Sequence, residues 1–289
     1  MKLLVKFNLV LLLIFAVGFI AVGYIANSLL QRNAEQEINE NARIMMEAAL
    51  AVRSYTASQV KPLLDTQMKY TFLPQSVPAY SANEYFKQVQ KKFPDYSYKE
   101  ATLNPTNPVN RATDWEADIV DKFRQSPDKT EIIGERDTPN GRMMYIARPM
   151  KVAPGCLPCH STPSAAPATM IERYGTANGF GWKANDILTA QIVSAPMTLP
   201  IKRARTAFNG FMTSFAAVLV VIILALNAML MIFVIRPVQQ LSHIADEVSL
   251  GNLDAPELQV TGSDEISTLA KCFNRMRKSA TEAIKMLET

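Results

Sequence analysis

The chain contains few of the residues from which most catalytic and metal sites are built, with three cysteines and two histidines among 289 residues. So few cysteines exclude a small disulfide-stapled scaffold. The histidines and carboxylates form no evident hydrolytic constellation, and no glycine-rich loop is present that could cradle a nucleotide phosphate. The net charge of only +4 gives no reason to expect a nucleic-acid partner. We therefore expect a protein that is not an enzyme.

Two of the cysteines and one histidine are concentrated in a single pentapeptide, Cys156-Leu157-Pro158-Cys159-His160. This CxxCH pattern is typical of a c-type haem attachment site. The thiols of Cys156 and Cys159 would bond the porphyrin vinyl groups, and the imidazole of His160 would bind the iron from one face. The pattern predicts one covalently bound haem c.

Two other interpretations of the motif have less support. A structural zinc site needs about four ligands, and the remaining candidates, His243 and Cys272, lie beyond the second apolar segment. A thiol–disulfide site uses CxxC at a helix start in a thioredoxin-like βαβ unit. No such unit is evident around Pro154-Gly155, and that chemistry gives His160 no role.

Two long segments lack any charged residue, from 7 to 31 and from 206 to 235. A helix needs about 20 apolar residues to cross a bilayer, so we predict membrane spans at 7–30 and 207–235. The first segment could instead be a cleaved signal peptide, because Lys2 and Lys6 precede it. Its apolar core is longer than the roughly 7–15 residues of such a peptide, which favours a retained helix.

The orientation of the spans rests on the motif, because lysine and arginine flank both sides of the predicted membrane and the positive-inside rule does not decide. Covalent haem attachment is expected outside the cytosol, and the lone Cys272 suits a reducing compartment. We therefore place 31–206 in the periplasm, with 1–6 and 236–289 in the cytoplasm. The protein is then expected in the inner membrane of a bacterium.

The segment between the spans mixes helical and strand patterns, which predicts an α+β fold of the PAS type with a long N-terminal helix. We expect Asp114 to cap the third of its helices. The turn Pro139-Asn140-Gly141 is expected to join two paired strands. Helices are predicted at 31–67, 82–93, 114–125 and 166–174. Strands are predicted at 97–103, 130–135, 142–152 and 186–196.

Several short stretches carry a family resemblance: Arg53-Ser54-Tyr55, 104–112 with Trp115-Glu116, the CxxCH motif, and Phe180-Gly181-Trp182-Lys183. Together they resemble the PAS-like periplasmic domains of bacterial membrane sensors that bind c-type haem, over about residues 35–198. The resemblance implies that His160 is one axial iron ligand. The opposite ligand varies in that family, from a sulfur on the N-terminal helix to water.

The ligand opposite His160 stays open between methionine, water and vacancy, because 31–206 contains no further cysteine or histidine. If it is a methionine, the resemblance favours Met45 or Met46 on the N-terminal helix. Three other methionines precede the motif: Met143, Met144 and Met150.

Other side chains have candidate roles beside the haem. Arg53 and Tyr55 are candidates to contact haem propionates, since arginine pairs well with carboxylates. The two tryptophans, Trp115 and Trp182, are expected in the core.

The segment after the second span predicts two short helices joined by a connector. The first helix carries apolar residues at helical spacing: Val238, Leu241, Ala245 and Val248. The connector, from Gly251, includes Leu253, Pro256, Leu258 and Val260. The second helix starts at Asp264-Glu265, where acids favour a helix N-terminus. Its apolar residues alternate steps of three and four, as in a coiled coil: Ile266, Leu269, Phe273, Met276, Ala280, Ala283 and Leu287.

This cytoplasmic segment resembles a HAMP linker, through Pro237, Gly251, Asp264-Glu265-Ile266 and Phe273-Asn274-Arg275-Met276. HAMP linkers are parallel four-helix bundles made by two chains, which implies a homodimer and a cytoplasmic signalling partner. We therefore interpret the chain as a membrane haem sensor that responds to a redox change or a small ligand such as a gas. The alternative is a membrane-anchored c-type cytochrome that carries electrons, although such a protein needs no HAMP module.

Overall fold

The computed structural model describes residues 3–252, 255–259 and 262–288. The chain divides into two compact units, Ala26–Phe208 and Met1–Ile25 with Asn209–Thr289. The first unit contains the CxxCH motif, and the second contains most of the apolar segments.

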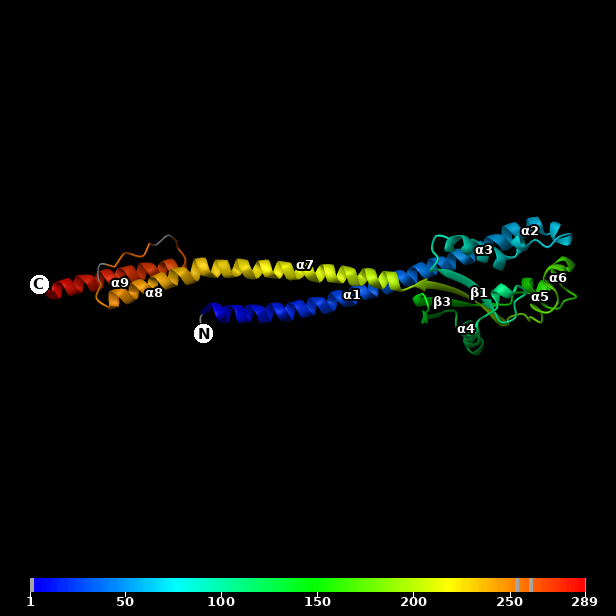
Figure 1. Ribbon diagram of the computed structural model, residues 1–289, viewed down its shortest axis with the longest axis horizontal. Coiled ribbons are helices and arrows are strands. Elements are labelled where there is room, and N and C mark those ends of the chain that lie inside the picture. Colours follow the sequence, from blue (N-terminus) through cyan, green and yellow to red (C-terminus); the bar gives the residue numbers. More distant parts are fainter. Residues whose placement is uncertain (1–2, 253–254, 260–261, 289) are drawn as a thin grey trace. The chain divides into compact units, whose positions relative to one another are not determined.

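The Ala26–Phe208 unit is built on a four-stranded antiparallel sheet of order β1-β4-β3-β2. Figure 1 labels two of its strands, β1 and β3. Its strands match the four predicted ones: β1 (Ser97–Thr102), β2 (Ile132–Thr138), β3 (Gly141–Lys151) and β4 (Ile187–Pro196). Pro139 and Asn140 form the tight turn between β2 and β3, and Gly141 adopts a φ of +109° there. The last strand lies between β1 and β3, so the first and last strands of the unit are neighbours in one sheet.

The long N-terminal helix α1 (Leu3–Tyr55) is continuous with the first apolar segment, as predicted. It does not run unbroken to residue 67. A π-helical turn occupies Thr56–Val60, and the short helix α2 (Lys61–Leu64) follows it. The buried Thr56 hydroxyl donates to the Val52 carbonyl at 2.8 Å, a side-chain bond that competes with the regular helical ladder.

The remaining helices of this unit are short: α3 (Pro78–Gln90), α4 (Asp114–Gln125), α5 (Leu157–His160) and α6 (Ala168–Tyr174). The prediction that Asp114 caps α4 is wrong. Thr113 is the capping residue, and its backbone N–H donates to the Glu116 carboxylate at 2.8 Å in a capping box. The Thr-x-x-Glu spacing favours this arrangement because it satisfies two orphan backbone donors at once.

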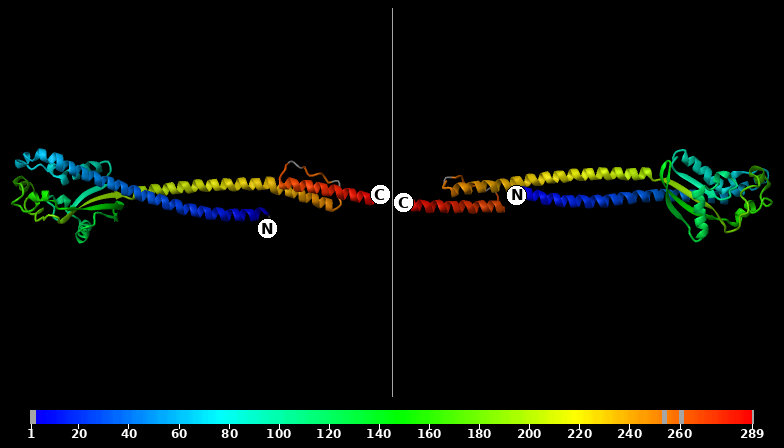
Figure 2. Two further views of the ribbon diagram at one scale, coloured as in Figure 1. Left: turned by 180° about the vertical axis from the view of Figure 1, so that it is seen from behind. Right: turned by 60° about the horizontal axis from the view of Figure 1, so that its bottom comes forward.

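Helices cover both faces of the sheet (Figure 2). On one face, α1 and α3 pack against alternate strand residues; this first core contains Ile38, Ala42, Met46, Ala49, Phe86, Tyr98, Ile146 and Val193. On the other face, α4 inserts Ile119, Val120 and Phe123 against Ala101, Ala147 and Ile192. Burying each large apolar side chain stabilises the fold by roughly 1.5–3 kcal/mol.

Among the described residues, two helices are long and apolar enough to cross a membrane: α1, through its first part, and α7 (Thr198–Leu230), most of which belongs to the second unit. Helix α7 continues through a π-helical turn (Met231–Ile235) into α8 (Arg236–Ser249). Asn8 and Asn227 exchange two side-chain hydrogen bonds of 2.8 Å between α1 and α7. Phe19 stacks on Phe215 with ring centroids 5.9 Å apart. These contacts define the register of the two helices.

The C-terminal segment forms two helices, α8 and α9 (Glu265–Glu288), as predicted. Asn274 holds the connector, since its side chain bonds both the N–H and the carbonyl of Leu258 at 3.2 and 2.9 Å. Two predicted seam residues of α9, Leu269 and Met276, are 50% and 61% exposed in the single chain. Predictions for Leu253, Val260 and the Leu287 side chain lie outside the described part of the chain. The predicted fold class, α+β followed by a helical pair, is confirmed.

The Asn8–Asn227 pair gives a first prediction. Replacing Asn227 by Leu leaves Asn8 without its partner in an apolar environment. We expect the association of α1 and α7 to weaken by about 0.6–1.7 kcal/mol. This association is measured by the yield of a bis-maleimide cross-link between cysteines introduced at Gly23 and Met212, because these positions touch in the helix pair.

A matched control is Asn209→Leu, because this asparagine lies on the same helix and its side chain has no hydrogen bond to α1 among the described residues. Its cross-linking yield is expected to equal that of the parent chain. Equal yields in the Asn227→Leu and parent chains would contradict a role for the pair.

Candidate functional site

The CxxCH motif lies directly after β3, on a turn of 3-10 helix (Pro154–Cys156) and the one-turn helix α5. The thiols of Cys156 and Cys159 are both free and partly buried. Burial raises the pKa of Cys159 above its ordinary value, and the charge of Lys61 opposes this effect. The two thiols and the imidazole therefore belong to one short, ordered segment.

The His160 ring is held in a defined orientation and tautomer. Its Nδ1 lies 2.8 Å from the carbonyl oxygen of Gly179, and a carbonyl can only accept, so Nδ1 carries the proton. The lone pair is then on Nε2, which is free to bind a metal. Burial lowers the pKa of His160, against the effect of the Gly179 bond, and this favours the neutral, metal-binding form. Trp182 stacks on the ring at 4.1 Å between centroids.

The loop that presents Gly179 is fixed by its neighbours. The Gly179 N–H donates to Oδ1 of Asn104 at 3.1 Å, and Nδ2 of Asn104 donates to the Phe180 carbonyl at 3.3 Å. Gly179 has a φ of +85°, and a Cβ there would lie 2.0 Å from the Thr106 hydroxyl oxygen. Only glycine fits this position, so Gly179 and the stretch Phe180-Gly181-Trp182 that follows it orient the His160 imidazole.

Cys156, Cys159 and His160 line a cavity of about 1140 Å³. The cavity is of the size that suits a large cofactor, since small-molecule sites span about 300–1,000 Å³. Side chains from the α1–α2 junction reach it, including Arg53, Ala57 and Lys61. Its wall also includes methionine side chains from three different segments: Met68, Met150 and Met170.

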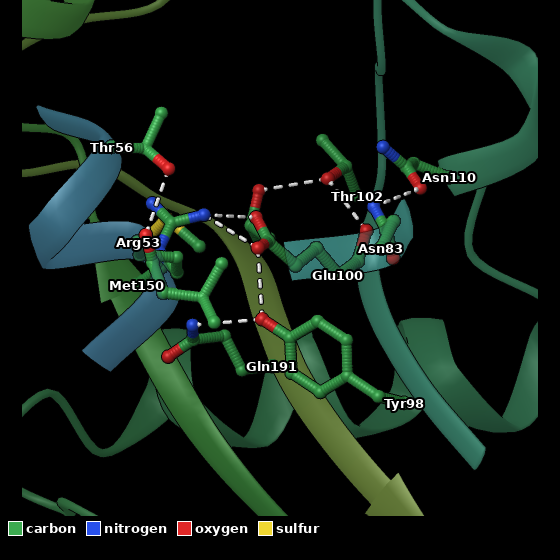
Figure 3. Close-up of polar contacts among 11 residues, drawn as sticks. Arg53, Thr56, Asn83, Tyr98, Glu100, Thr102, Asn110, Met150 and Gln191 are labelled. Carbon is green, nitrogen blue, oxygen red and sulfur yellow. Dashed lines mark hydrogen bonds and ion pairs between the residues drawn. The ribbon is translucent and has the colours of Figure 1, made fainter. Parts of the chain in front are cut away.

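A buried ion pair joins Arg53 and Glu100 (Figure 3), and both residues line the cavity. Nη1 of Arg53 lies 2.5 and 2.6 Å from the two carboxylate oxygens of Glu100, which is only 3% exposed. Tyr98 donates its hydroxyl to the same carboxylate at 2.8 Å and accepts from Gln191 at 3.1 Å. Nη2 of Arg53 donates to the Met150 sulfur at 3.3 Å. The burial and the carboxylate together raise the pKa of Tyr98, which stays a neutral donor.

The register of the sheet explains why these polar groups meet. Tyr98, Val193 and Ile146 face one another across three strands and form part of the apolar core. Side chains two residues along each strand point to the same face. The next rows across β1, β4 and β3 are therefore Glu100, Gln191 and Arg148, then Thr102, Thr189 and Met150. The face thus changes from apolar to polar toward the CxxCH segment.

The donor groups around the motif fit a covalently bound haem. Trp182 lines the cavity, and its indole Nε1 is buried and has no hydrogen-bond partner among the described residues. An unsatisfied buried donor needs an explanation, and a haem carboxylate is a suitable acceptor. The free Nε2 of His160 and the two adjacent thiols supply the other required groups. The described residues contain no cluster of three His, Cys, Asp or Glu side chains that could hold a metal ion.

The structure brings only some of the predicted residues to the cavity. Arg53 lines it, but its guanidinium is engaged by Glu100. Tyr55 is 57% exposed and does not line the cavity, so the predicted propionate contact gains no support. Trp182 stacks on His160 and was wrongly expected in the core. Trp115 packs against the core around Phe123, as expected, and also lines the cavity.

The favoured methionine ligands lie elsewhere. Met46 is fully buried in the core between α1 and the sheet, Met45 packs beside that core, and neither lines the cavity. Their helical phase turns them to the apolar stripe of α1. Met143 and Met144 are also buried away from the cavity. Of the methionines named from the sequence, Met150 is the one that lines the cavity, and Met68 and Met170 line it as well.

Sequence reasoning missed Glu100, Gly179 and Met68. Glu100 had a detectable signal, because it occupies the inward phase of β1, two residues after the buried Tyr98. A charged residue in that phase indicates a buried polar site. Gly179 lies in an Asn-Gly-Phe-Gly stretch whose contact with His160 depends on folding. No local pattern marks Met68.

The class of the protein follows from its two recognisable parts. Residues 225–282 match the HAMP domain, so the chain carries a signalling linker next to its apolar helices. Residues 31–196 match the Tll0287-like family, and the chain belongs to that family. The chain is also similar to the cyanobacterial haem-protein Tll0287 in its crystal structure. The two are 17% identical, with 55% of this chain and 95% of that chain covered and a TM-score of 0.43. No curated protein matches the chain.

Gly179 gives the second prediction. In Gly179→Ala the new methyl group collides with Thr106 in a left-handed backbone conformation, so the carbonyl must move away from His160. We expect the unfolding free energy to fall by more than about 1 kcal/mol. Once haem is attached, the electronic spectrum should also report altered histidine ligation.

Gly181→Ala is the matched control, because Gly181 has a φ of +80° but no atom lies within 4 Å of the place that a Cβ would occupy. It shares the backbone strain and leaves the His160–Gly179 bond in place. Thermal unfolding and absorption spectra of the full chain measure both effects. Identical spectra for the two variants would contradict the orienting role of Gly179.

Proposed function

We propose that the protein is a membrane-bound haem-c sensor, with Cys156 and Cys159 bonded to one haem and His160 as an iron ligand. The observation that carries the proposal is the free Nε2 of His160, fixed by Gly179 beside two thiols at the wall of a large cavity. When bound, the haem supplies a one-electron redox centre or an iron site for a small ligand. The protein's own groups attach it, orient the imidazole and satisfy its polar edges.

The sensor role is supported by the HAMP domain that follows the second apolar helix. A protein that only carries electrons has no need of a linker that converts conformational change. We further propose that residues 31–206 face the periplasm and 236–289 the cytoplasm, since covalent haem attachment occurs outside the reducing cytosol.

A homodimer is the proposed functional unit. Leu269 and Met276 lie on the seam of α9 and are at least half-exposed in a single chain, although the heptad pattern calls for their burial. A second copy of the chain would cover them in a four-helix bundle. The signalling partner in the cytoplasm would then contact the dimer.

The attachment chemistry gives the third prediction. The chain produced with a c-type maturation system should carry haem that survives denaturing electrophoresis. A Cys156→Ala, Cys159→Ala double variant should lose this covalent haem entirely, because both thioether bonds are removed. His160→Ala should keep covalent haem and lose the histidine ligand, which changes the absorption spectrum. Haem staining and reduced-minus-oxidised spectra measure these outcomes, and covalent haem in the double variant would refute the proposal.

The sixth iron ligand gives the fourth prediction. We propose a cavity methionine or an exchangeable position opposite His160, and CO separates the two cases. With an open position, ferrous protein binds CO immediately; with Met150 on the iron, CO binding is slow and becomes at least about tenfold faster in Met150→Leu. Met46→Leu is the control in the core and should leave the rate of CO binding unchanged in either case. Acceleration by Met46→Leu but not by Met150→Leu would restore the N-terminal helix as the ligand source.

A further inference from the structure

The Arg53–Glu100 pair connects the cavity wall to the helix that continues into the first apolar segment. Arg53 belongs to α1, whereas Glu100 belongs to β1, and both line the cavity with the CxxCH residues. Their side chains are 21% and 3% exposed. Charges this poorly hydrated interact strongly with any further charge in the same cavity.

The two partners are not equally free to move. Glu100 is fixed to the sheet, because Tyr98 donates to its carboxylate and Thr102 donates to its backbone carbonyl at 3.2 Å. Tyr98 is itself held by Gln191 on β4. Arg53 has no comparable anchor among the described residues beyond Glu100 and the weak sulfur contact with Met150. A change of charge in the cavity therefore acts mainly on the Arg53 side.

Helix α1 is irregular where it carries Arg53. The π-helical turn of Thr56–Val60 begins three residues later, and the Thr56 hydroxyl bonds the Val52 carbonyl across the Arg53 position. Turns of this kind are rare, occur mostly as single turns inside α-helices, and are frequent at functional sites. The fully buried stripe of α1 ends at Ala49, and beyond it only the partly buried Leu50 and Val52 of this helix pack against the core. A local change at Arg53 can thus occur without opening the core.

We propose that the Arg53–Glu100 ion pair is the contact through which the redox state of the bound haem acts on helix α1. The inference rests on the proposed haem function. A more positive centre in the cavity repels Arg53 and loosens the pair, and a less positive centre lets it tighten. The protein accordingly responds to a change of charge, which a neutral gas does not bring.

The change involved is a one-electron transfer. An external one-electron reductant is oxidised by one electron, ferric iron becomes ferrous, and no bond in the protein forms or breaks. The signal reaches α1 only through the electrostatic difference between these two states, as any such coupling requires.

Hydrogen–deuterium exchange of the full haem-loaded chain in lipid nanodiscs tests the inference. Peptides covering residues 50–60 are compared in the ferric form, in the dithionite-reduced form, and in the reduced form with CO. We expect exchange to slow several-fold on reduction and to stay slow with CO. Glu100→Gln should abolish the difference between the states, and the midpoint potential should rise because a negative charge is lost.

The chain offers a matched control in Arg43→Gln. Arg43 also belongs to α1 and pairs with Glu131 at 2.7 Å, but neither residue lines the cavity. This variant breaks an ion pair of the same helix and should keep the redox-dependent exchange. If Glu100→Gln does not fold, the double variant Arg53→Met, Glu100→Leu replaces the pair by apolar groups of similar volume, a change that cores often tolerate.

The outcomes separate the two proposals. Absence of attached haem in the parent chain would overturn the haem function itself. Attached haem with state-independent exchange would overturn only this inference. The inference would also be overturned if redox-dependent exchange persisted in Glu100→Gln or in the double variant. A midpoint potential unchanged by Glu100→Gln would likewise overturn it.

Discussion

The packing of α1 on the sheet is the interaction on which the other features depend. Its stripe of Ile38, Ala42, Met46 and Ala49 fixes the helix over the apolar end of β1, β3 and β4. One further turn of the same helix brings Arg53 over the polar end of the same face, above Glu100. The cavity, the ion pair and the support of the CxxCH segment all follow from this change of polarity along one face.

The buried charge at Glu100 is costly and calls for a functional reason. Removing one partner of a buried ion pair destabilises a protein by about 3–5 kcal/mol, whereas replacing both by apolar groups is often neutral. Stability alone therefore does not require Arg53 and Glu100, and an apolar pair would continue the core. Tyr98 and Gln191 satisfy the remaining hydrogen bonds of the pair, and the proposed electrostatic response to the haem gives a reason for charges at this site.

Periodicity made much of this structure predictable from the sequence. The four strands, the long helix and the heptads of α9 are local patterns, and the CxxCH motif is contiguous. What could not be predicted depends on contacts between distant segments. The Gly179 carbonyl reaches His160 across 19 residues, and Glu100 reaches Arg53 across 47. The methionine prediction meets the same limit: the helical phase of Met45 and Met46 was visible in the sequence, but the position of the cavity, which neither residue lines, was not.

The chain's connectivity explains why a single ion pair can matter for signalling. Arg53 lies on α1, which runs without interruption to Leu3, whereas Thr189 and Ser194 of the cavity wall lie on β4, which ends at Pro196 just before α7 begins at Thr198. Each apolar helix is therefore a direct extension of one wall of the same cavity. A charge-dependent adjustment between those walls needs no separate transmission pathway, because the covalent chain carries it. The coupling is then limited by the stiffness of two helices, and the π-helical turn of Thr56–Val60 lies on the other side of Arg53, outside that path.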